Sequence, residues 1–180
     1  MPVTPFHFGP ATVAKAVSPK HFSLVAFGLT QVVIDIEPIF YISQGMWPIH
    51  RFFHTYIGAT AVAVFVILFG RRICEGLLRL WNWRLSDDQR SWLGVNPRIS
   101  RAAMTTGALF GAYSHVFLDS IMHSDMRPFA PLSDENGLLY IISIDRLHQV
   151  CAISAIVGVT VLLIFLVRRK MGVERAAPPA

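Results

Sequence analysis

Charge is what this sequence has least of. Asp, Glu, Lys and Arg make up 15% of its 180 residues, 53% are hydrophobic, and the mean hydropathy is +0.50. Soluble globular domains carry about 25% charged residues, so the composition excludes an ordinary soluble domain. It predicts an integral membrane protein, whose spans of about 20 residues each leave no room for a separate soluble domain.

Cysteine is also scarce, since only Cys74 and Cys151 occur and no CxxC spacing is present. This excludes a disulfide framework and leaves the redox compartment open. We interpret Cys151 as a packing residue, with a thiolate ligand beside His148 as the alternative. The net charge of +5 comes from basic residues that flank apolar runs rather than interleave with exposed aromatics, so we expect no nucleic-acid partner.

Long apolar runs are abundant. Four of them have the length of membrane spans, at residues 22–42, 52–70, 102–122 and 147–167. A backbone in lipid must satisfy its own hydrogen bonds, so each run is expected to be a helix. The predicted fold is an all-α bundle of four transmembrane helices forming one membrane domain over residues 1–170, followed by a disordered tail at 171–180.

Residues 73–85, between spans two and three, mix leucine and tryptophan with arginine. This pattern predicts an amphipathic helix at the cytoplasmic interface. Ser86 and Gln89 then have the spacing of a capping box, which predicts a second short helix.

The distribution of Lys and Arg predicts the orientation. Thirteen of the sixteen precede span one, lie between spans two and three, or follow span four. Basic residues concentrate on the cytoplasmic side of membrane proteins, so both termini are expected to be cytoplasmic. The opposite side has only Arg51, Arg127 and Arg146.

Ionisable residues inside spans are the most informative feature, because each one costs about 2.5–3.5 kcal/mol unless it has a partner. The predicted topology brings all of them toward the same outer end of the bundle. They are Asp35, Glu37, His50, His54, His115, Asp119, His123, Asp145 and His148.

Their spacing is typical of metal ligands. His50 with His54, His115 with Asp119, and Asp119 with His123 are i,i+4 pairs on single helical faces. Nitrogen-rich mixed ligation favours zinc, with manganese or iron as alternatives. The predicted ligands are Asp35, His50, His54, His115, Asp119 and His148. Interhelical hydrogen bonds or a proton relay remain the alternative interpretation.

Other residues near this end are predicted to have roles beside that of metal ligand. Glu37 and His123 are predicted to act as general acid or base, or as ligands of a second metal. Arg51, Arg127 and Arg146 can bind a phosphate or carboxylate of a substrate, or form ordinary salt bridges. His7 and His21 are placed on the inner side and excluded from the site.

Three motifs resemble a known family: D-I-E-P at 35–38, H-R-F-F-H-T at 50–55 and S-H-V-F-L-D-S at 114–120. They are similar to the P-D-x-D, H-R-x-x-T-H-S and S-H-x-x-x-D motifs of bacterial LexA-regulated, inner-membrane metal-dependent hydrolases. The chain departs from the pattern at Glu37, which replaces the second aspartate, at the missing proline before Asp35, and at Thr55, which follows His54 instead of preceding it.

The resemblance covers about residues 21–131 and implies a multi-pass protein of the bacterial inner membrane. Together with the polar cluster it predicts a metal-dependent hydrolase acting at the outer face on a lipid or a lipid-linked ester or phosphoester. Two alternatives stay open: a transporter or channel for a metal or small solute, and a noncatalytic membrane module with a structural metal site. Oligomeric state is not predicted.

Overall fold

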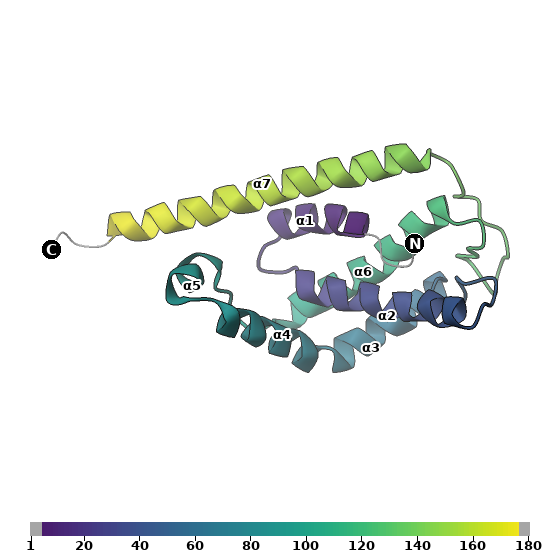
Figure 1. The fold of residues 1–180 in the computed structure, drawn as a ribbon, viewed down its shortest axis with the longest axis horizontal. Coiled ribbons are helices and arrows are strands. Elements are labelled where there is room, and N and C mark those ends of the chain that lie inside the picture. The colour runs from purple at the N-terminus through teal and green to yellow at the C-terminus, as the bar shows by residue number, and fades with distance from the viewer. Residues whose placement is uncertain (1–4, 177–180) are drawn as a thin grey trace.

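The computed structural model describes residues 5–176 and is helical, without strands in that range. Figure 1 shows the arrangement of the elements. In chain order they are η1 (Pro5–His7), α1 (Phe8–Val17), α2 (Leu24–Ser43), α3 (Tyr56–Phe69), α4 (Arg71–Arg84), α5 (Asp87–Leu93), α6 (Arg101–Met122) and α7 (Ile144–Ala176).

Two of the described helices, α2 and α7, are long and apolar enough to cross a membrane. A third crossing is possible if α3 and α4, which meet at a bend of 64°, form one broken span. The structure therefore supports a helical membrane protein with two or three candidate spans. It differs from the predicted span at 52–70, because α3 begins only at Tyr56 and its 14 residues extend about 21 Å.

Helix α6 is the central element, packing against both α2 and α3. Its contact with α2 is close because Gly107 and Gly111 face that helix. A Cβ on Gly107 would overlap the carbonyl oxygen of Ser23, and one on Gly111 would lie 3.1 Å from that of Phe27. Small residues four apart let helix backbones approach in this way, and the approach brings the polar face of α2 against that of α6.

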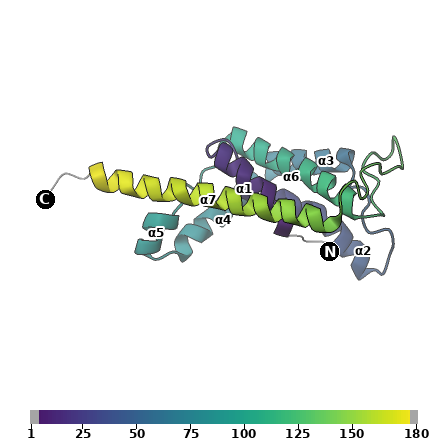
Figure 2. The same cartoon turned by 90° about the horizontal axis from the view of Figure 1, so that it is seen from above.

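Helix α1 lies along the first half of α7, as both views show (Figures 1 and 2). A turn joins α1 to α2, and Lys15 closes it by donating from Nζ to the carbonyl oxygens of Pro19 and Phe22 at 2.6 and 2.8 Å. Ser23 then caps α2 by accepting from the backbone N–H of Ala26. This path places the start of α1, at His7, beside the middle of the bundle.

Basic residues gather at one end of the molecule. A cavity of about 710 Å³ is lined by basic side chains from α1, the α1–α2 turn, the α5–α6 loop and α7, namely Lys15, Lys20, Arg98 and Arg169. The C-terminal half of α7 extends past this end (Figure 1). Four of the thirteen basic residues predicted to share one side thus lie together in the fold.

Several local predictions have clear outcomes. The capping box of Ser86 and Gln89 is confirmed at the start of α5. A helix covers the predicted amphipathic segment, as α4, with Trp81 and Trp83 exposed. Of the tail predicted to be disordered, residues 171–176 belong to α7 and residues 177–180 lie outside the described part of the chain.

Candidate metal centre

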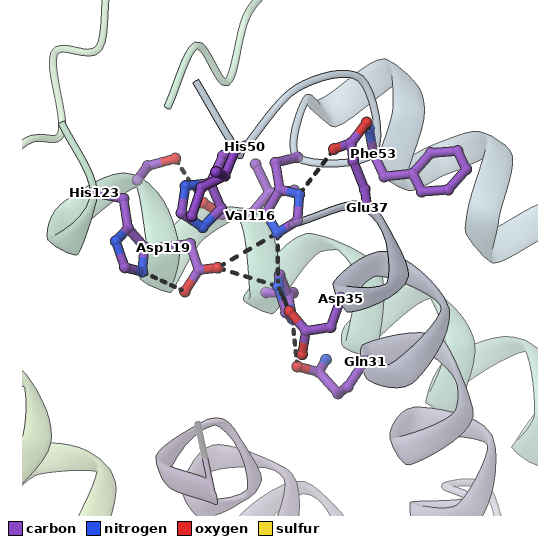
Figure 3. A network of polar contacts seen from close by, with 12 residues as sticks. Gln31, Asp35, Glu37, His50, Phe53, Val116, Asp119 and His123 are labelled. Atoms are coloured by element: carbon purple, nitrogen blue, oxygen red, sulfur yellow. Dashed lines mark hydrogen bonds and ion pairs between the residues drawn. The ribbon is translucent and has the colours of Figure 1, made fainter. Parts of the chain in front are cut away.

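A buried cluster of histidines and carboxylates lies where the C-terminal halves of α2 and α6 meet the loop before α3 (Figure 3). Asp35 comes from α2, His50 and His54 from the loop, and His115 and Asp119 from α6. Each of these five side chains is at most 5% exposed. The structure thus brings together five of the six residues predicted as metal ligands.

His115 is oriented by Gln31, one turn before Asp35 on α2. The amide nitrogen of Gln31 donates to the carbonyl oxygen of Gly111 at 2.7 Å, so its amide oxygen faces the imidazole. That oxygen lies 2.7 Å from Nδ1 of His115. Because an amide oxygen only accepts, Nδ1 must donate, and the neutral ring presents an unprotonated Nε2 to the cluster.

His54 is oriented in the same way by Glu37. Its Nδ1 lies 3.1 Å from Oε2 of Glu37. The same carboxylate accepts from the backbone N–H groups of Arg51 and Phe53 at 3.0 to 3.1 Å, and so anchors the loop to α2. An ionised carboxylate only accepts hydrogen bonds. Nε2 of the neutral His54 ring therefore also presents a lone pair to the cluster.

Four possible ligand atoms converge between these rings. Nε2 of His115 is 3.3 Å from Nε2 of His54, 3.4 Å from Oδ1 of Asp35 and 3.1 Å from Oδ2 of Asp119. Nε2 of His54 is 3.7 Å from Oδ2 of Asp119. Ligands about 2.1 Å from a tetrahedral zinc ion lie about 3.4 Å apart, so these four separations fit ligands of one ion, and Asp35, His54 and His115 form one of the candidate metal groups.

Electrostatics favours a cation in this space. Lone pairs and carboxylate charges that face one another in a buried space repel unless a proton or a metal ion lies between them. Groups drawn from His7, Asp35, His50, His54, His115 and Asp119 have ligand atoms within 4.8 Å of one another and can hold a metal ion. His50, His123 and Asp125 form a further such group.

His50 is held by Asp125, which follows α6. Nδ1 of His50 lies 2.8 Å from Oδ1 of Asp125, and Oδ2 accepts from the backbone N–H groups of Ile49 and His50. Burial opposes ionisation of Asp125, but these hydrogen bonds outweigh burial and lower its pKa. The ionised carboxylate thus orients His50 as second carboxylates orient metal-bound histidines elsewhere.

His123 lies at the open side of the cluster, with its side chain 22% exposed and Nε2 4.0 Å from Oδ1 of Asp119. Burial lowers the pKa of His123 to about 4, so the ring is neutral at pH 7. Its ring stacks on that of His50 at 4.3 Å between centroids. A neutral, partly accessible imidazole can accept a proton or bind a metal.

The exclusion of His7 is wrong. Its side chain is 3% exposed, and its Nε2 lies 3.1 Å from Oδ1 of Asp119. The prediction assumed that residues before span one remain at the inner end. Instead, α1 runs back along α7 and carries His7 to the level of the cluster. The sequence held only an indirect signal for this, the short helical segment after His7.

Two predicted residues are not brought to the cluster. The ring of His148, near the start of α7, stacks on Phe6 at 4.4 Å between centroids, and His148 is in none of the candidate metal groups. Arg146 is exposed on the same helix. The start of α7 still packs on the end of α6, since Leu147 shares a buried apolar cluster with Leu118 and Met122, but His148 packs on Phe6 instead of joining the ligands.

The other two arginines line a cavity of about 620 Å³ beside the cluster, together with His50 and Asp125. The Arg51 guanidinium lies 3.8 Å from the centre of the Tyr41 ring and donates from Nε to the carbonyl oxygen of Pro48. Arg127 is exposed and pairs with Asp134 at 3.1 Å. Arg51 is therefore fixed in the cavity wall, whereas Arg127 is held only by an exposed partner.

Sequence reasoning missed the roles of Gln31 and Asp125. Gln31 shares a helical face with Asp35, one turn away in an apolar run, and this spacing was an available signal. Asp125 follows α6 in an irregular loop, where no periodicity relates it to His50.

Comparisons with protein-family models, with curated proteins and with solved structures found no match. The class of protein is therefore defined by its own fold and site: a helical protein with candidate membrane spans and a buried histidine and carboxylate cluster able to hold a metal ion.

Proposed function

We propose that this protein is a membrane-embedded hydrolase that uses a divalent metal ion, best suited to zinc, held by Asp35, His54, His115 and Asp119. The observation that carries the proposal is the convergence of two Nε2 atoms and two carboxylate oxygens at 3.1 to 3.7 Å. Both histidines keep Nε2 free because Gln31 and Glu37 occupy Nδ1. The resemblance to inner-membrane metal-dependent hydrolases supports the same reaction class.

A bound ion of this kind supplies Lewis-acid activation of water and of the scissile bond. The chain supplies the remaining functions. His123 accepts the proton that water loses and returns it to the leaving oxygen, because its ring is neutral and partly accessible. Glu37 acts as a positioning residue for His54, since its carboxylate is occupied by the loop before α3.

The substrate class we propose is an ester or phosphoester of a lipid. The cavity beside His50 offers the guanidinium groups of Arg51 and Arg127 to an anionic head group. Exposed apolar side chains surround the bundle, as expected for contact with acyl chains. In this arrangement α2, α3, α6 and α7 cross the membrane, α4 lies at the interface, and the basic end faces the cytoplasm.

Metal content measured by elemental analysis of the detergent-purified chain tests the site. His54→Ala and Asp119→Ala should each lose most of the bound metal, whereas His21→Ala, an exposed histidine away from the cluster, should keep it. Unchanged metal content in the first two variants would remove the metal site.

Turnover is then measured on phospholipids and lipid-linked phosphates. Hydrolysis that stops on chelation and returns with zinc supports the enzyme, and its absence across the panel overturns it. Metal flux in proteoliposomes without hydrolysis would favour a transporter instead. Because the ligands lie in the C-terminal halves of α2 and α6 and not between discontinuous helices, we expect no flux.

A further inference from the structure

Two buried polar atoms in the described part of the chain lack a hydrogen bond: Nε2 of His7 and Oδ1 of Asp119. They face each other at 3.1 Å. Leaving a buried polar atom without a partner costs about 1–3 kcal/mol. Two such atoms 3.1 Å apart form an ion pair if the ring is protonated, and need a cation between them if it is not.

A proton on Nε2 of His7 would be the simplest way to join the two atoms. Whether Nε2 carries a proton depends on what Nδ1 of the same ring binds. Nδ1 of His7 lies 3.2 Å from Oε1 of Gln31, which also accepts from Nδ1 of His115. Since Gln31 Nε2 is committed to Gly111, its oxygen can only accept from both rings. With Nδ1 donating to Gln31, the Nε2 of each ring faces Asp119, and it carries a lone pair whenever the ring has a single proton.

The arrangement is thus paired around Asp119. Oδ2 faces Nε2 of His115 at 3.1 Å, and Oδ1 faces Nε2 of His7 at the same distance. The amide oxygen of Gln31 binds Nδ1 of both imidazoles, and each oxygen of the Asp119 carboxylate faces the Nε2 of one of them. A carboxylate whose oxygens each face an imidazole lone pair is placed to bridge two cations.

We propose that the centre holds a second divalent metal ion, bound between Nε2 of His7 and Oδ1 of Asp119, so that the Asp119 carboxylate bridges two ions. This inference rests on the first ion of the proposed function. His123, the proton acceptor of the proposed function, has its Nε2 4.0 Å from Oδ1 of Asp119 and lies on the partly accessible side. Water would complete the coordination on that side.

The second ion narrows the substrate class to phosphoesters. Two ions about 3.5–4 Å apart suit displacement at phosphorus, where attacking and leaving oxygens both carry charge. Arg51 and Arg127 line the adjacent cavity and can pair with the remaining phosphate oxygens. The N-terminal segment consequently forms one wall of the active site.

The test counts ions in the full-length chain, stripped with a chelator, reloaded with Zn²⁺ and freed of excess metal. The wild type should retain two ions per chain and His7→Ala one, whereas His21→Ala should retain two. One ion per chain in the wild type, or two in His7→Ala, would overturn the inference. In the first case His7 and Asp119 form an ion pair.

Electron paramagnetic resonance of the Mn²⁺-loaded chain gives a second, independent readout. A spin-coupled pair is expected in the wild type and an isolated ion in His7→Ala, while magnetically isolated ions in the wild type would contradict a shared carboxylate. If His7→Ala does not fold, as judged by circular dichroism and gel filtration, His7→Gln takes its place. Gln31→Leu, which removes the common acceptor, should likewise lower the ion count.

Failure here is separable from failure of the hydrolase. Two bound ions without turnover on any ester would leave the bridged centre standing and remove the enzyme. Turnover with one ion per chain would support the hydrolase and remove the bridged centre. A phosphoester substrate is supported if phosphoesters are hydrolysed at least tenfold faster than carboxylic esters of matched lipids, and the reverse preference contradicts it.

Discussion

Glu37 holds other groups in place with a charge that is itself buried. Its carboxylate accepts from Nδ1 of His54 and from two backbone N–H groups of the following loop. Glu37→Gln keeps the shape of the side chain but replaces one accepting oxygen by an amide NH₂, which cannot accept from these N–H groups. Second carboxylates of this kind contribute about 10–100-fold to metal affinity, so we expect a loss of that size, measured by competition with a chelating dye.

Glu135 provides the control for Glu37. It is exposed in the loop before α7, and Glu135→Gln should leave metal affinity unchanged. If Glu37→Gln instead kept full metal affinity and lost turnover, Glu37 would be the general acid or base that the sequence predicts, and its positioning role would be rejected.

Asp125 acts on His50 in the same manner. Asp125→Asn exchanges three charge-assisted hydrogen bonds, to Nδ1 of His50 and to two backbone N–H groups, for weaker ones. We expect the melting temperature to fall by several degrees both with and without zinc, as followed by thermal denaturation. Asp134→Asn, at an exposed ion pair with Arg127, should leave the melting temperature unchanged.

For single residues, the sequence predicts those site residues that are spaced one helical turn apart. Asp35, His115 and Asp119 were predictable because the cost of a buried charge and the i,i+4 spacing both single them out. His54 followed from its spacing to His50, although both lie in a loop. His7 and Asp125 were not predictable, since the return of α1 along α7 brings the first to the cluster and an irregular loop brings the second. The prediction of His148 as a ligand was wrong because the depth of a residue along a span does not determine toward which neighbour its side chain points.

Among the elements, the pairing of α2 with α6 determines whether the centre exists. Asp35, Gln31 and Glu37 come from one helix, and His115 and Asp119 from the other. Gly111 lies at their contact, where a Cβ would be 3.1 Å from both the backbone oxygen of Phe27 and Cβ of Thr30. A larger side chain there must push the two helices apart.

We therefore expect Gly111→Leu to reduce zinc affinity at least tenfold and to lower the melting temperature. Zinc titration followed by tryptophan fluorescence measures the first quantity. Gly76→Leu is the matched control, because nothing lies within 4 Å of a Cβ at that position in α4. Equal zinc affinity in the two variants would show that the approach of α2 and α6 does not position the ligands.

The predicted span at 52–70 shows why helix boundaries near a site are hard to predict. The run is apolar enough to be helical throughout, yet residues 50–55 leave the helix because Glu37 binds the N–H groups of Arg51 and Phe53. Thr55 then caps α3 by accepting from Gly58. Tertiary hydrogen bonds thus override local propensity, and hydropathy does not detect them.

The two ends of the molecule carry different kinds of polar residue. Basic side chains surround the cavity at one end, whereas the cluster, the short loop before α3 and the long loop before α7 occupy the other. This separation was predictable because it depends on composition along the chain and not on atomic contacts. Its direction across the membrane stays a prediction from the distribution of Lys and Arg.

Cysteine labelling in intact bacterial cells tests that direction. Cys74 and Cys151 are buried and should not react, so single probes can be added to the natural sequence. Gly137→Cys, in the loop before α7, should react with a membrane-impermeant maleimide in intact cells. Ser91→Cys, exposed on α5 at the basic end, should react only after permeabilisation. The reverse pattern would turn the metal centre toward the cytoplasm and exclude substrates of the outer leaflet.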